Sequence, residues 1–574
     1  MNARLHSSTL RTLRKAPLVA GLALACAGLT AHAADRNRPT FEQRLDAHRI
    51  ADRQHLAQRP KPARAPERPA GILTVSNCDD AGAGSLREAF AAAVSGDVID
   101  LTALECSTIT LTSGALATSA NDITLNGPGA ELLAIDGNNQ DRIIDHSGTG
   151  TLTLNALALR NGLYDGTDTV YGEADGGCVL STGGVTLTGV AVDHCSAIAG
   201  WVTGGAIRAS YIVQLTDSTI TGTTATATRT GFSAGAYGGV VYGGVAYLDR
   251  STISDATITV TGTETAFSGG IGGGILTFGG VVLTDSTVTG VSVSVSAPKD
   301  AYAEGGGIAA RNAIILVNST VSNNSVTGTP GAGVVGAYTY RSAIRGGGLY
   351  IGRTPEGYAF PATITNSTIS GNSALVIGDP GEFTYNGGGG ILTHGQRVVT
   401  ITNPTVSGNS AALNGGGLYG HDFGAFALAN ATITDNTAQT GGGIVDAGTR
   451  TSYDLVTNSS IIAGNHTLGD PANDLETIHT ITGANNLITS ANAPLPEGTL
   501  TGDPMLAPLA DNGGATLTHA LLAGSPAIDT GNNAASLDTD QRGEGFVRVS
   551  GAAADIGAFE AQGDVDTIFR DGFE

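Results

Sequence analysis

Hydrophobic and polar residues alternate along most of the chain, in short runs separated by turn residues. In the run from Val281 to Thr284, Val281 and Leu283 occupy one face and Val282 and Thr284 the other. The runs are rich in Thr, Val and Ile, and Gly, Asn and Ser follow every few positions. A period of two with these residue types predicts β-strands rather than helices.

The strand pattern belongs to a repeat that is clearest between Gly269 and His466. Each copy begins with a glycine run, continues into an apolar strand and ends in a Ser/Thr/Asn turn. The clearest copies are GGGILTFGGVVLTDSTVTG from Gly272, GGGIAARNAIILVNSTVSNNS from Gly305, GGGGILTHGQRVVTITNPTVSGNSA from Gly387 and GGGLYGHDFGAFALANATITDNTA from Gly415. Repeats of this size indicate a solenoid. A two-layer sandwich could use the same strands, but stacked coils explain why the glycines return at the same phase, so we predict a right-handed parallel β-helix.

Stacked coils lie ~4.8 Å apart, so equivalent residues should form columns. One expected apolar column contains Ile275, Ile308, Leu349, Ile391, Leu418 and Ile444. The glycine runs suit a tight corner where positive φ is required. A second corner is expected to hold a structural ladder of Asn residues, which tolerate the left-handed conformation and can bond the next coil. These residues are Asn324, Asn372, Asn409, Asn436 and Asn465.

The N-terminal region has the features of an export signal. Residues 1–33 contain basic residues, then an apolar run from Ala16 to Leu29 and the small-residue site Ala31-His32-Ala33, typical of a cleaved signal peptide. The apolar run is too short to span a bilayer. Residues 34–70 form a basic linker rich in Pro and Arg. We therefore expect a mature chain without a transmembrane segment, located outside the cell or on its outer surface.

Charge and cysteine content agree with export. Of the 29 basic residues, four lie in the signal and nine in the linker, so residues 69–574 hold 16 basic residues against 46 of the 51 acids, a net charge of −30. Such a surface repels nucleic acid. Four cysteines remain after the signal, and of the three possible connectivities we predict Cys78–Cys106 and Cys178–Cys195. No Cys-x-x-Cys spacing occurs, which argues against a zinc site.

Residues 71–149 are expected to form an N-terminal cap and the first coils. The capping box Ser85-Leu86-Arg87-Glu88 predicts a short helix through about Val94 that covers the first coil. The stretch CDDAGAGSLREAF resembles the opening of the exported β-helix proteins of the CSLREA type, with Gly84 in place of their cysteine. The segment from Ile123 that begins ITLNGPGA resembles the first coils of pectin-lyase-like β-helices.

Residues 150–466 carry the repeats, and residues 467–562 are expected to hold further coils and a separate C-terminal domain. DPMLAPLADNGGATLTHALLAGSPAIDTG from Asp503, TDQRG from Thr539 and ADIGAFE from Ala554 resemble the choice-of-anchor (Q-type) domain. Its charged residues, Asp529, Asp540, Arg542, Asp555 and Glu560, suggest an active site, but an ion-paired cap on the last coil is favoured. The tail, residues 563–574, resembles short sorting or anchoring sequences.

Catalytic candidates follow from the repeat phase. His394 and His421 each lie three residues after the apolar column and should stack in adjacent coils, with Arg311 in the same phase and Asp422 and Asp446 nearby. Adjacent imidazoles would suit a metal, a proton relay or an anionic sugar, while two ordinary surface histidines are the favoured alternative. The paired-aspartate, GHG and RIK segments of polygalacturonases are missing.

Aromatic residues gather in the variable segments just before the glycine corners, and these segments should emerge along one edge. The candidate ligand-binding residues are Tyr302, Tyr338, Tyr340, Phe383 and Tyr385. Flat rings suit sugars or a protein partner, although Tyr can equally anchor long loops. We expect an adhesin-like monomer that binds glycan or protein without catalysis, and without a cofactor unless Ca²⁺ is bound. One alternative is a lyase or hydrolase of acidic polysaccharide, although the chain has few cations to neutralise the carboxylates of such a substrate. The other alternative is a structural surface-layer protein.

Overall fold

The computed structural model describes residues 68–168, 172–230, 233–263, 268–298, 300–331, 342–352, 362–378, 386–395, 397–422, 424–448, 454–468 and 473–562. All of these lie in the compact unit formed by residues 61–574. The predicted signal peptide, nearly all of the linker and the C-terminal tail fall outside the described residues, so these predictions stay untested.

The described residues form one helix and four sheets, and the bounds of each element are as follows. The helix is α2 (Leu86–Ala92). Sheet I contains β1 (Ile72–Thr74), β2 (Val98–Asp100), β4 (Leu116–Thr118), β5 (Ile123–Asn126), β7 (Ile144–His146), β8 (Thr151–Asn155), β12 (Val179–Ser181), β13 (Gly184–Thr188), β17 (Ile207–Ala209), β18 (Ile212–Thr216), β22 (Val241–Asp249), β26 (Ile275–Thr284), β30 (Ile308–Ala310), β31 (Ala313–Val317), β35 (Leu349–Ile351), β36 (Ala362–Thr365), β39 (Ile391–His394), β40 (Arg397–Thr402), β43 (Leu418–His421), β44 (Gly424–Ala429), β47 (Ile444–Ala447), β48 (Leu455–Asn458), β51 (Leu475–Thr477) and β52 (Ile481–Thr482). Sheet II contains β3 (Thr108–Thr110), β6 (Ala134–Asp136), β9 (Ala158–Arg160), β14 (Ala191–Asp193), β19 (Thr219–Thr221), β23 (Thr252–Ser254), β27 (Thr287–Thr289), β32 (Thr320–Ser322), β37 (Thr368–Ser370), β41 (Thr405–Ser407), β45 (Thr432–Thr434), β49 (Ile461–Ile462) and β53 (Leu487–Ile488). Sheet III contains β10 (Leu163–Asp165), β15 (Ser196–Ala199), β20 (Thr224–Arg229), β24 (Thr257–Gly262), β28 (Ser292–Ala297), β33 (Ser325–Pro330), β38 (Ser373–Val376), β42 (Ser410–Ala411), β46 (Thr437–Ala438) and β50 (His466–Thr467). Sheet IV contains β11 (Glu173–Asp175), β16 (Trp201–Thr203), β21 (Ala234–Tyr237), β25 (Ser268–Ile271), β29 (Ala301–Glu304) and β34 (Ser342–Arg345).

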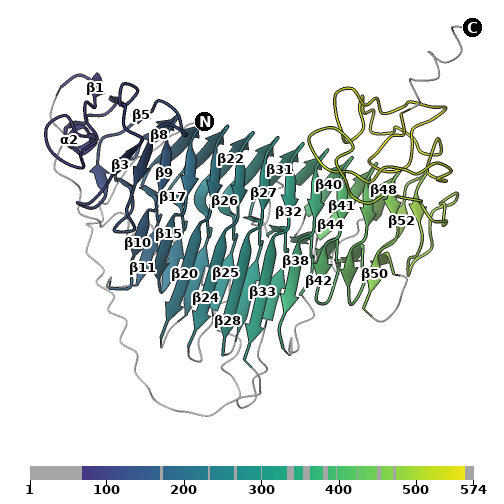
Figure 1. Cartoon of the computed structure of the whole chain (residues 1–574). Coiled ribbons are helices and arrows are strands. Elements are labelled where there is room, and N and C mark those ends of the chain that lie inside the picture. The colour runs from purple at the N-terminus through teal and green to yellow at the C-terminus, as the bar shows by residue number, and fades with distance from the viewer. Residues whose placement is uncertain are drawn as a thin grey trace, which may run out of the picture. The chain divides into compact units, whose positions relative to one another are not determined.

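The chain coils so that each strand pairs in parallel with the equivalent strand of the next repeat (Figure 1). In sheet I, Ile275 of β26 aligns with Ile308 of β30, which aligns with Leu349 of β35. Sheet III follows the same order, with β24 between β20 and β28. Parallel pairing between successive repeats in every sheet confirms the predicted parallel β-helix.

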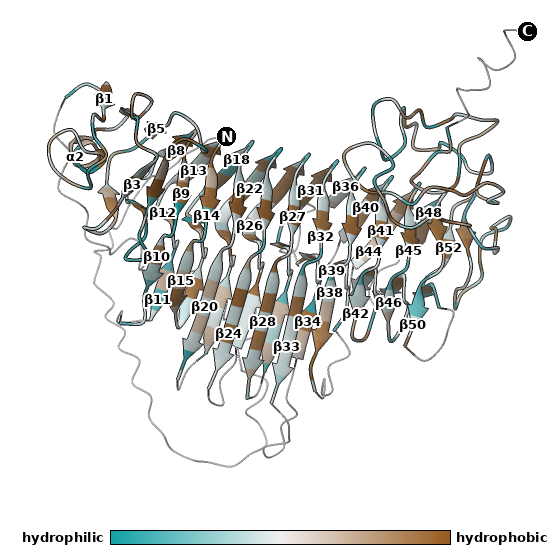
Figure 2. Cartoon of the chain, in the orientation of Figure 1, coloured by the Kyte–Doolittle hydropathy of each residue, from teal (hydrophilic) through white to brown (hydrophobic). Residues whose placement is uncertain are grey.

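The interior of the coils is lined by columns of apolar residues, as the sequence period predicts. Ile275, Ile308, Leu349, Ile391, Leu418 and Ile444 align by register and are all fully buried. Hydrophobic positions follow one another across successive strands (Figure 2). Burial of each such side chain contributes roughly 1.5–3 kcal/mol, and the column is therefore a main source of cohesion between coils.

The N-terminal end of the solenoid is covered by the predicted short helix. The Ser85 hydroxyl accepts a hydrogen bond from the Glu88 amide, as expected for a capping box. The Glu88 carboxylate accepts its hydrogen bond from the Gly84 amide, at 2.6 Å, and not from the Ser85 amide. Leu86 and Phe90 are buried beneath the helix. The helix ends at Ala92 rather than near Val94, because the backbone is already extended at Ala93.

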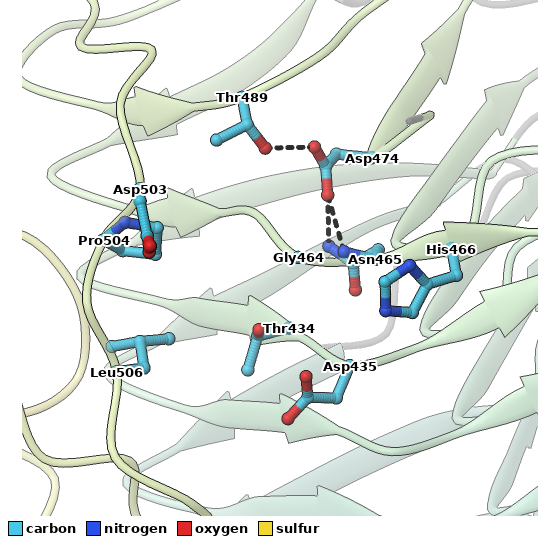
Figure 3. Close-up of a pocket in the computed structure, with 10 residues that line it drawn as sticks. All are labelled: Thr434, Asp435, Gly464, Asn465, His466, Asp474, Thr489, Asp503, Pro504 and Leu506. Carbon is cyan, nitrogen blue, oxygen red and sulfur yellow. Dashed lines mark hydrogen bonds between the residues drawn. The ribbon is translucent and has the colours of Figure 1, made fainter. Parts of the chain in front are cut away.

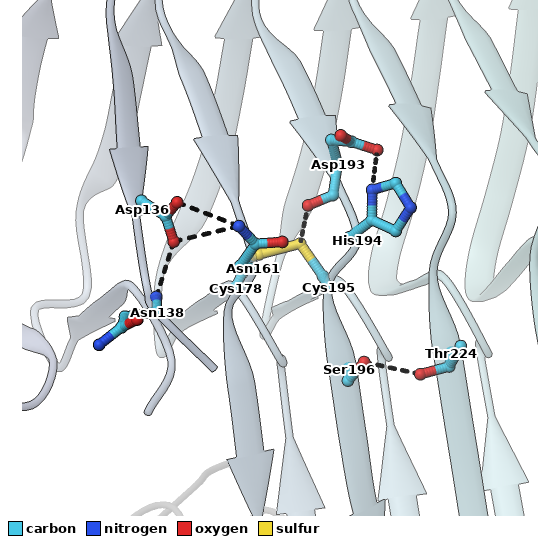
Figure 4. The surroundings of a disulfide bond; sticks show 9 residues. All are labelled: Asp136, Asn138, Asn161, Cys178, Asp193, His194, Cys195, Ser196 and Thr224. Carbon is cyan, nitrogen blue, oxygen red and sulfur yellow. Dashed lines mark hydrogen bonds and ion pairs between the residues drawn. A yellow bond between two sulfur atoms is a disulfide. The ribbon is translucent and has the colours of Figure 1, made fainter. Parts of the chain in front are cut away.

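Both predicted disulfides are present. Cys78–Cys106 joins parts of the cap, and Cys178–Cys195 crosses the interior of a single coil, 17 residues apart in sequence (Figure 4). Cys178 precedes β12 and Cys195 precedes β15, so the second bond links the glycine corner to the opposite corner. Both of its cysteines are fully buried.

The predicted asparagine ladder occupies that opposite corner. From Asn324 to Asn436, the backbone amide and side-chain amide of each Asn donate to the side-chain oxygen of the next, at 2.9–3.1 Å. Asn465 donates in the same way to Asp474 at 2.8 and 3.0 Å, which ends the ladder. The expected left-handed backbone is one residue earlier, at Asn323, Gly371, Gly408, Asp435 and Gly464. The ladder side chains can therefore point into the coil.

The C-terminal segment, residues 503–562, lies along the outside of sheet II. The Gln541 side chain donates to the Thr368 hydroxyl at 2.8 Å and accepts from the Thr405 hydroxyl at 2.6 Å, while the Ala558 amide donates to Thr432. The interpretation as a cap on the last coil is therefore wrong. The last coil is instead covered by residues 491–500, where Ala491 pairs with Leu475 and Leu500 with Leu487.

Candidate functional site

The candidate site lies along the glycine corner between sheets IV and I. The first glycine of each triplet has positive φ, for example 68° at Gly305 and 59° at Gly415. A Cβ at Gly415 would lie 2.3 Å from the carbonyl oxygen of Leu418, so only glycine fits this turn. After the corner, the first and third strand residues point into the coil and the second and fourth point outward.

His394 and His421 are brought together as predicted. They end β39 and β43, they align directly in register, and their ring centroids lie 5.1 Å apart. Asp422 is the residue after His421, and one of its carboxylate oxygens lies 3.7 Å from Nε2 of His394. The three side chains form an outward-facing group at one place on the solenoid.

Two tyrosines of the same corner hold the histidines. The Tyr350 hydroxyl lies 3.5 Å from Nδ1 of His394, and the Tyr419 ring meets the His421 ring edge-on at 5.7 Å. Both tyrosines are 3% exposed, so they pack as part of the corner. Sequence reasoning missed them because it considered only aromatics before the glycines, although the recurring GGGLY was a usable signal.

Arg311 lies in the predicted column but is separated from the histidines. Gly352 occupies the intervening position, since β30, β35 and β39 pair in order. The Arg311 guanidinium lies 5.8 Å from the Phe278 ring centroid. Arg311 therefore packs with Phe278, one coil earlier in the column, and not with the histidines.

Asp446 is not part of the outward group. It aligns with Gly420, the residue before His421, and is fully buried in the coil interior. The prediction placed Asp446 near the histidines in the phase of the repeat. It lies one position before that phase, and alternation along β47 turns its side chain inward. Burial raises its pKa to about 6, against the lowering effects of the His479 charge and the Thr477 hydrogen bond.

The His421 imidazole is held neutral. Burial and, second, the positive charge of Arg345 lower its pKa to about 4. At neutral pH this ring can accept or donate a hydrogen bond but carries no positive charge. It is therefore poorly suited to attract a carboxylate group of an acidic sugar.

Three of the arginines along the corner are paired with acids, whereas Arg311 lies over the Phe278 ring. Arg345 lies 3.3 Å from Glu304, and Arg208 lies 4.0 Å from Asp175. Arg142 lies 3.6 Å from Asp145 and stacks over Tyr164 at 3.7 Å. These charges are compensated within the protein.

One of the five candidate ligand-binding aromatics can be placed. Tyr302 lies on β29 in sheet IV, half-buried, two residues before the corner acid Glu304. Tyr338, Tyr340, Phe383 and Tyr385 lie outside the described residues. In the same sheet Trp201 stacks on Tyr237 at 5.5 Å, and a Cβ at Gly235 would lie 2.5 Å from the Trp201 ring.

The charged residues of the C-terminal segment form a buried network. Arg542 bonds Asp540 at 2.6 Å and lies between the Phe546 and Phe559 rings, at 3.9 and 3.8 Å. Glu560 lies 3.4 Å from Arg548 and accepts from the Ser550 and Asp555 amides at 2.8 Å. Burial raises the pKa of Glu560 to about 7. These contacts give the cluster a structural role.

A pocket of about 470 Å³ lies where the C-terminal segment meets the ladder corner (Figure 3). Its lining includes the exposed Asp435, His466 and Asp503 and the buried Asp474. Asp474 already accepts hydrogen bonds from Asn465, Thr489 and Ser490. In the described part of the chain, no group of three or more His, Cys, Asp or Glu side chains is placed to hold a metal ion.

Comparison with known proteins does not identify a family for this chain. No family model and no curated protein matches the chain. Among solved structures, the crystal structure of pectate lyase Pel9A aligns with 12% identity and a TM-score of 0.26, covering 86% of this chain and 96% of that chain. The strand pairing by itself defines the chain as a parallel β-helix, and this fold does not decide between an enzyme and a binding protein. No helix in the described residues is long and apolar enough to cross a membrane.

Proposed function

We propose that the protein is an exported, adhesin-like β-helix that binds a glycan or a protein along its glycine corner without chemical turnover. The observation that carries this proposal is the state of the corner's ionisable groups. His421 has a pKa of about 4 and is neutral, and Arg345 and Arg208 are paired with Glu304 and Asp175. Elimination from a uronate needs uncompensated cations to stabilise the developing charge.

Half-exposed side chains supply the binding surface of this proposal. Trp201 and Tyr302 on sheet IV face the same corner as Phe278, His394 and His421 on sheet I. Rings and imidazoles on a rigid β-scaffold can stack on sugar faces at little entropic cost. The two disulfides agree with an extracellular location. The resemblances to CSLREA-type and choice-of-anchor proteins support export and surface attachment.

The test is a glycan-binding array with the full chain and a Tyr302→Ala variant. Loss of one stacking ring should weaken binding roughly 3- to 10-fold. Tyr211→Ala is the matched control, because Tyr211 is 59% exposed and lies in the turn between β17 and β18, outside sheet IV. Equal weakening by both substitutions, or no glycan and no protein ligand at all, would overturn the proposal in favour of a structural surface-layer role.

The second candidate is a lyase or hydrolase of acidic polysaccharide, favoured by the His394–His421–Asp422 group. A lyase and reducing-end assay on acidic and neutral polysaccharides, with and without Ca²⁺, distinguishes the two. Product that disappears in the His394→Ala, His421→Ala double variant would establish catalysis at this group. Binding without product would support the adhesin-like role.

A further inference from the structure

One face of sheet III is made entirely of hydroxyl side chains over four successive coils. The strands β20, β24, β28 and β33 are each six residues long, whereas every other strand of sheet III has four residues or fewer. Alternate residues of the four long strands are buried, and the three outward positions of each strand are Thr or Ser. We call this surface the hydroxyl face, and its members are Thr224, Thr226, Thr228, Thr257, Thr259, Thr261, Ser292, Ser294, Ser296, Ser325, Thr327 and Thr329.

The hydroxyl face is a regular grid. Its central column reads Thr226, Thr259, Ser294 and Thr327 by strand register, and the two flanking columns follow the same alignment. Hydroxyl groups therefore repeat every ~4.8 Å from coil to coil and every ~6.7 Å along a strand. The four strands lie side by side and run in nearly the same direction (Figure 1), so the grid continues from each strand to the next.

The positions of the hydroxyl groups are largely fixed by the scaffold. Each of the four strands is paired on both sides, from β15 at one end to β38 at the other. Thr side chains are restricted at χ1. At the margins of the face, the hydroxyls of Ser196 and Thr224 bond each other at 2.7 Å, and the Ser325 hydroxyl donates to that of Ser292 at 3.3 Å. A surface ordered in advance loses little conformational entropy when it binds a ligand.

The composition of the hydroxyl face argues against most classes of ligand. The face has no charged member, although residues 69–574 carry a net charge of −30, so it has no means to attract an ionic ligand. It has no aromatic ring to stack on a sugar. Four strands of six residues cover about 400 Å², which is about half of the ~800 Å² that each partner buries in a stable protein interface.

We propose that the hydroxyl face binds ice, with its hydroxyl groups taking the places of water oxygens in the crystal surface. Oxygen atoms on the prism planes of hexagonal ice repeat in two perpendicular directions, at distances close to the coil spacing and to the spacing along a strand. A hydroxyl group can donate one hydrogen bond and accept two, so it can replace a water molecule of the outermost layer. A crystal presents the same contacts to all columns at once, and many weak bonds then act together.

The hydroxyl face is separate from the surface proposed to bind a glycan or a protein. It lies on sheet III, whereas the glycine corner lies between sheets IV and I. Either proposal can therefore fail without the other, and each is tested with its own ligand.

The first test is the partition of the full chain into ice that is grown slowly through a protein solution. We expect enrichment in the ice relative to serum albumin, faceted crystals, and a freezing point below the melting point. Exclusion from the ice to the same extent as albumin overturns the proposal. Retention on microcrystalline cellulose or chitin without ice binding would also overturn it, because the face would then recognise a polysaccharide.

The second test uses Ser294→Tyr, which places a ring in the middle of the hydroxyl face. Ser294 is exposed, so the substitution should leave the unfolding midpoint unchanged. The ring would hold the crystal away from the neighbouring columns, and the ice-bound fraction should fall roughly tenfold or more. Thr400→Tyr is the matched control, because Thr400 is exposed on β40 of sheet I. Equal ice binding by the two variants would contradict the proposal.

Discussion

Removal of one rung of the asparagine ladder should destabilise the solenoid well beyond an ordinary substitution. Asn409 is 1% exposed and makes five hydrogen bonds through the ladder. Its oxygen accepts from the backbone and side-chain amides of Asn372 at 3.0 and 2.9 Å. Its own side-chain amide donates to the Ile369 carbonyl and to Asn436, both at 2.9 Å, and its backbone amide donates to Asn436 at 3.0 Å.

The magnitude follows from the groups that Asn409→Ala leaves without partners. The two Asn372 amide donors and the Ile369 carbonyl would lose a partner in a site closed to solvent. Each unsatisfied buried group costs ~1–3 kcal/mol, and water entering the vacated volume recovers part of this. We therefore expect a loss of about 3–5 kcal/mol in the free energy of unfolding of the surrounding coils.

Urea unfolding, together with hydrogen exchange of peptides that cover residues 366–440, measures this loss. The loss corresponds to a rise of roughly 10²- to 4 × 10³-fold in the exchange rate of the Asn372 amide if local opening limits exchange. Ser410→Ala is the control, since it changes the adjoining, half-buried residue of β42 outside the ladder and should stay within ~0.5 kcal/mol. If Asn409→Ala differs from Ser410→Ala by less than ~1 kcal/mol, the ladder does not stabilise the coils as reasoned here.

Three further predictions concern other parts of the solenoid. Ala206 and Thr223 lie one coil after Cys178 and Cys195, so the double variant Ala206→Cys, Thr223→Cys should form a disulfide. The bond should stabilise the oxidised protein by ~2–4 kcal/mol, and mass spectrometry should show the loss of two hydrogens. Free thiols in the oxidised variant would contradict the stacking register. The folded-state pKa of His421 is about 4, below the ordinary value of 6.5, so its contribution to stability is complete above pH 6.5 and is lost as the pH falls toward 4. His421→Gln should therefore reduce the loss of stability at acid pH by on the order of 2–3 kcal/mol. An unchanged loss of stability at acid pH would show that His421 is not buried in this way. Gly235→Ala should displace the single tryptophan, Trp201, and shift its fluorescence at a cost of ~1–3 kcal/mol, whereas Gly184→Ala should leave the spectrum unchanged.

Most of the fold could be predicted because the solenoid repeats its physical constraints. The glycine corner, the apolar column from Ile275 to Ile444 and the asparagine ladder return at the same phase in each copy. Each copy of the repeat therefore gives independent support for the same arrangement of corners and strands. The cysteine pairing followed from proximity in sequence, which becomes proximity in space when one coil is only a few tens of residues long.

The candidate site was less predictable, because strand alternation and local packing decide which way a side chain points. The phase argument placed His394 beside His421 correctly, since both occupy equivalent outward positions. It placed Asp446 nearby without giving the direction of its side chain, and a shift of one residue moves a side chain from the surface to the interior. The contribution of Tyr350 and Tyr419 depends on the depth of the corner between sheets IV and I, which the sequence does not state.

The position of the C-terminal segment illustrates a different limit. Its ion-paired character was visible in the sequence, and Arg542–Asp540 and Arg548–Glu560 are indeed paired. Its docking on sheet II depends on the Thr368, Thr405 and Thr432 hydroxyls, which look like every other Thr of the repeat. A contact between residues more than a hundred positions apart leaves no trace in a local pattern.

The glycine corner and the ladder corner of each coil pack against each other across the interior. The residues at these two facing positions therefore change together along the chain. The third glycine of a triplet faces the ladder across the interior: a Cβ at Gly307 would lie 3.0 Å from the Asn324 amide, and one at Gly443 would lie 2.8 Å from that of Asn465. In the earliest such coil the same two positions are Cys178 and Cys195. In the next coil they are Ala206 and Thr223, both buried. The facing positions are therefore joined covalently, then by apolar contact, and finally by glycine packed on a hydrogen-bonded amide; the first glycine triplet, Gly272–Gly274, comes one coil before the ladder and packs on Val288.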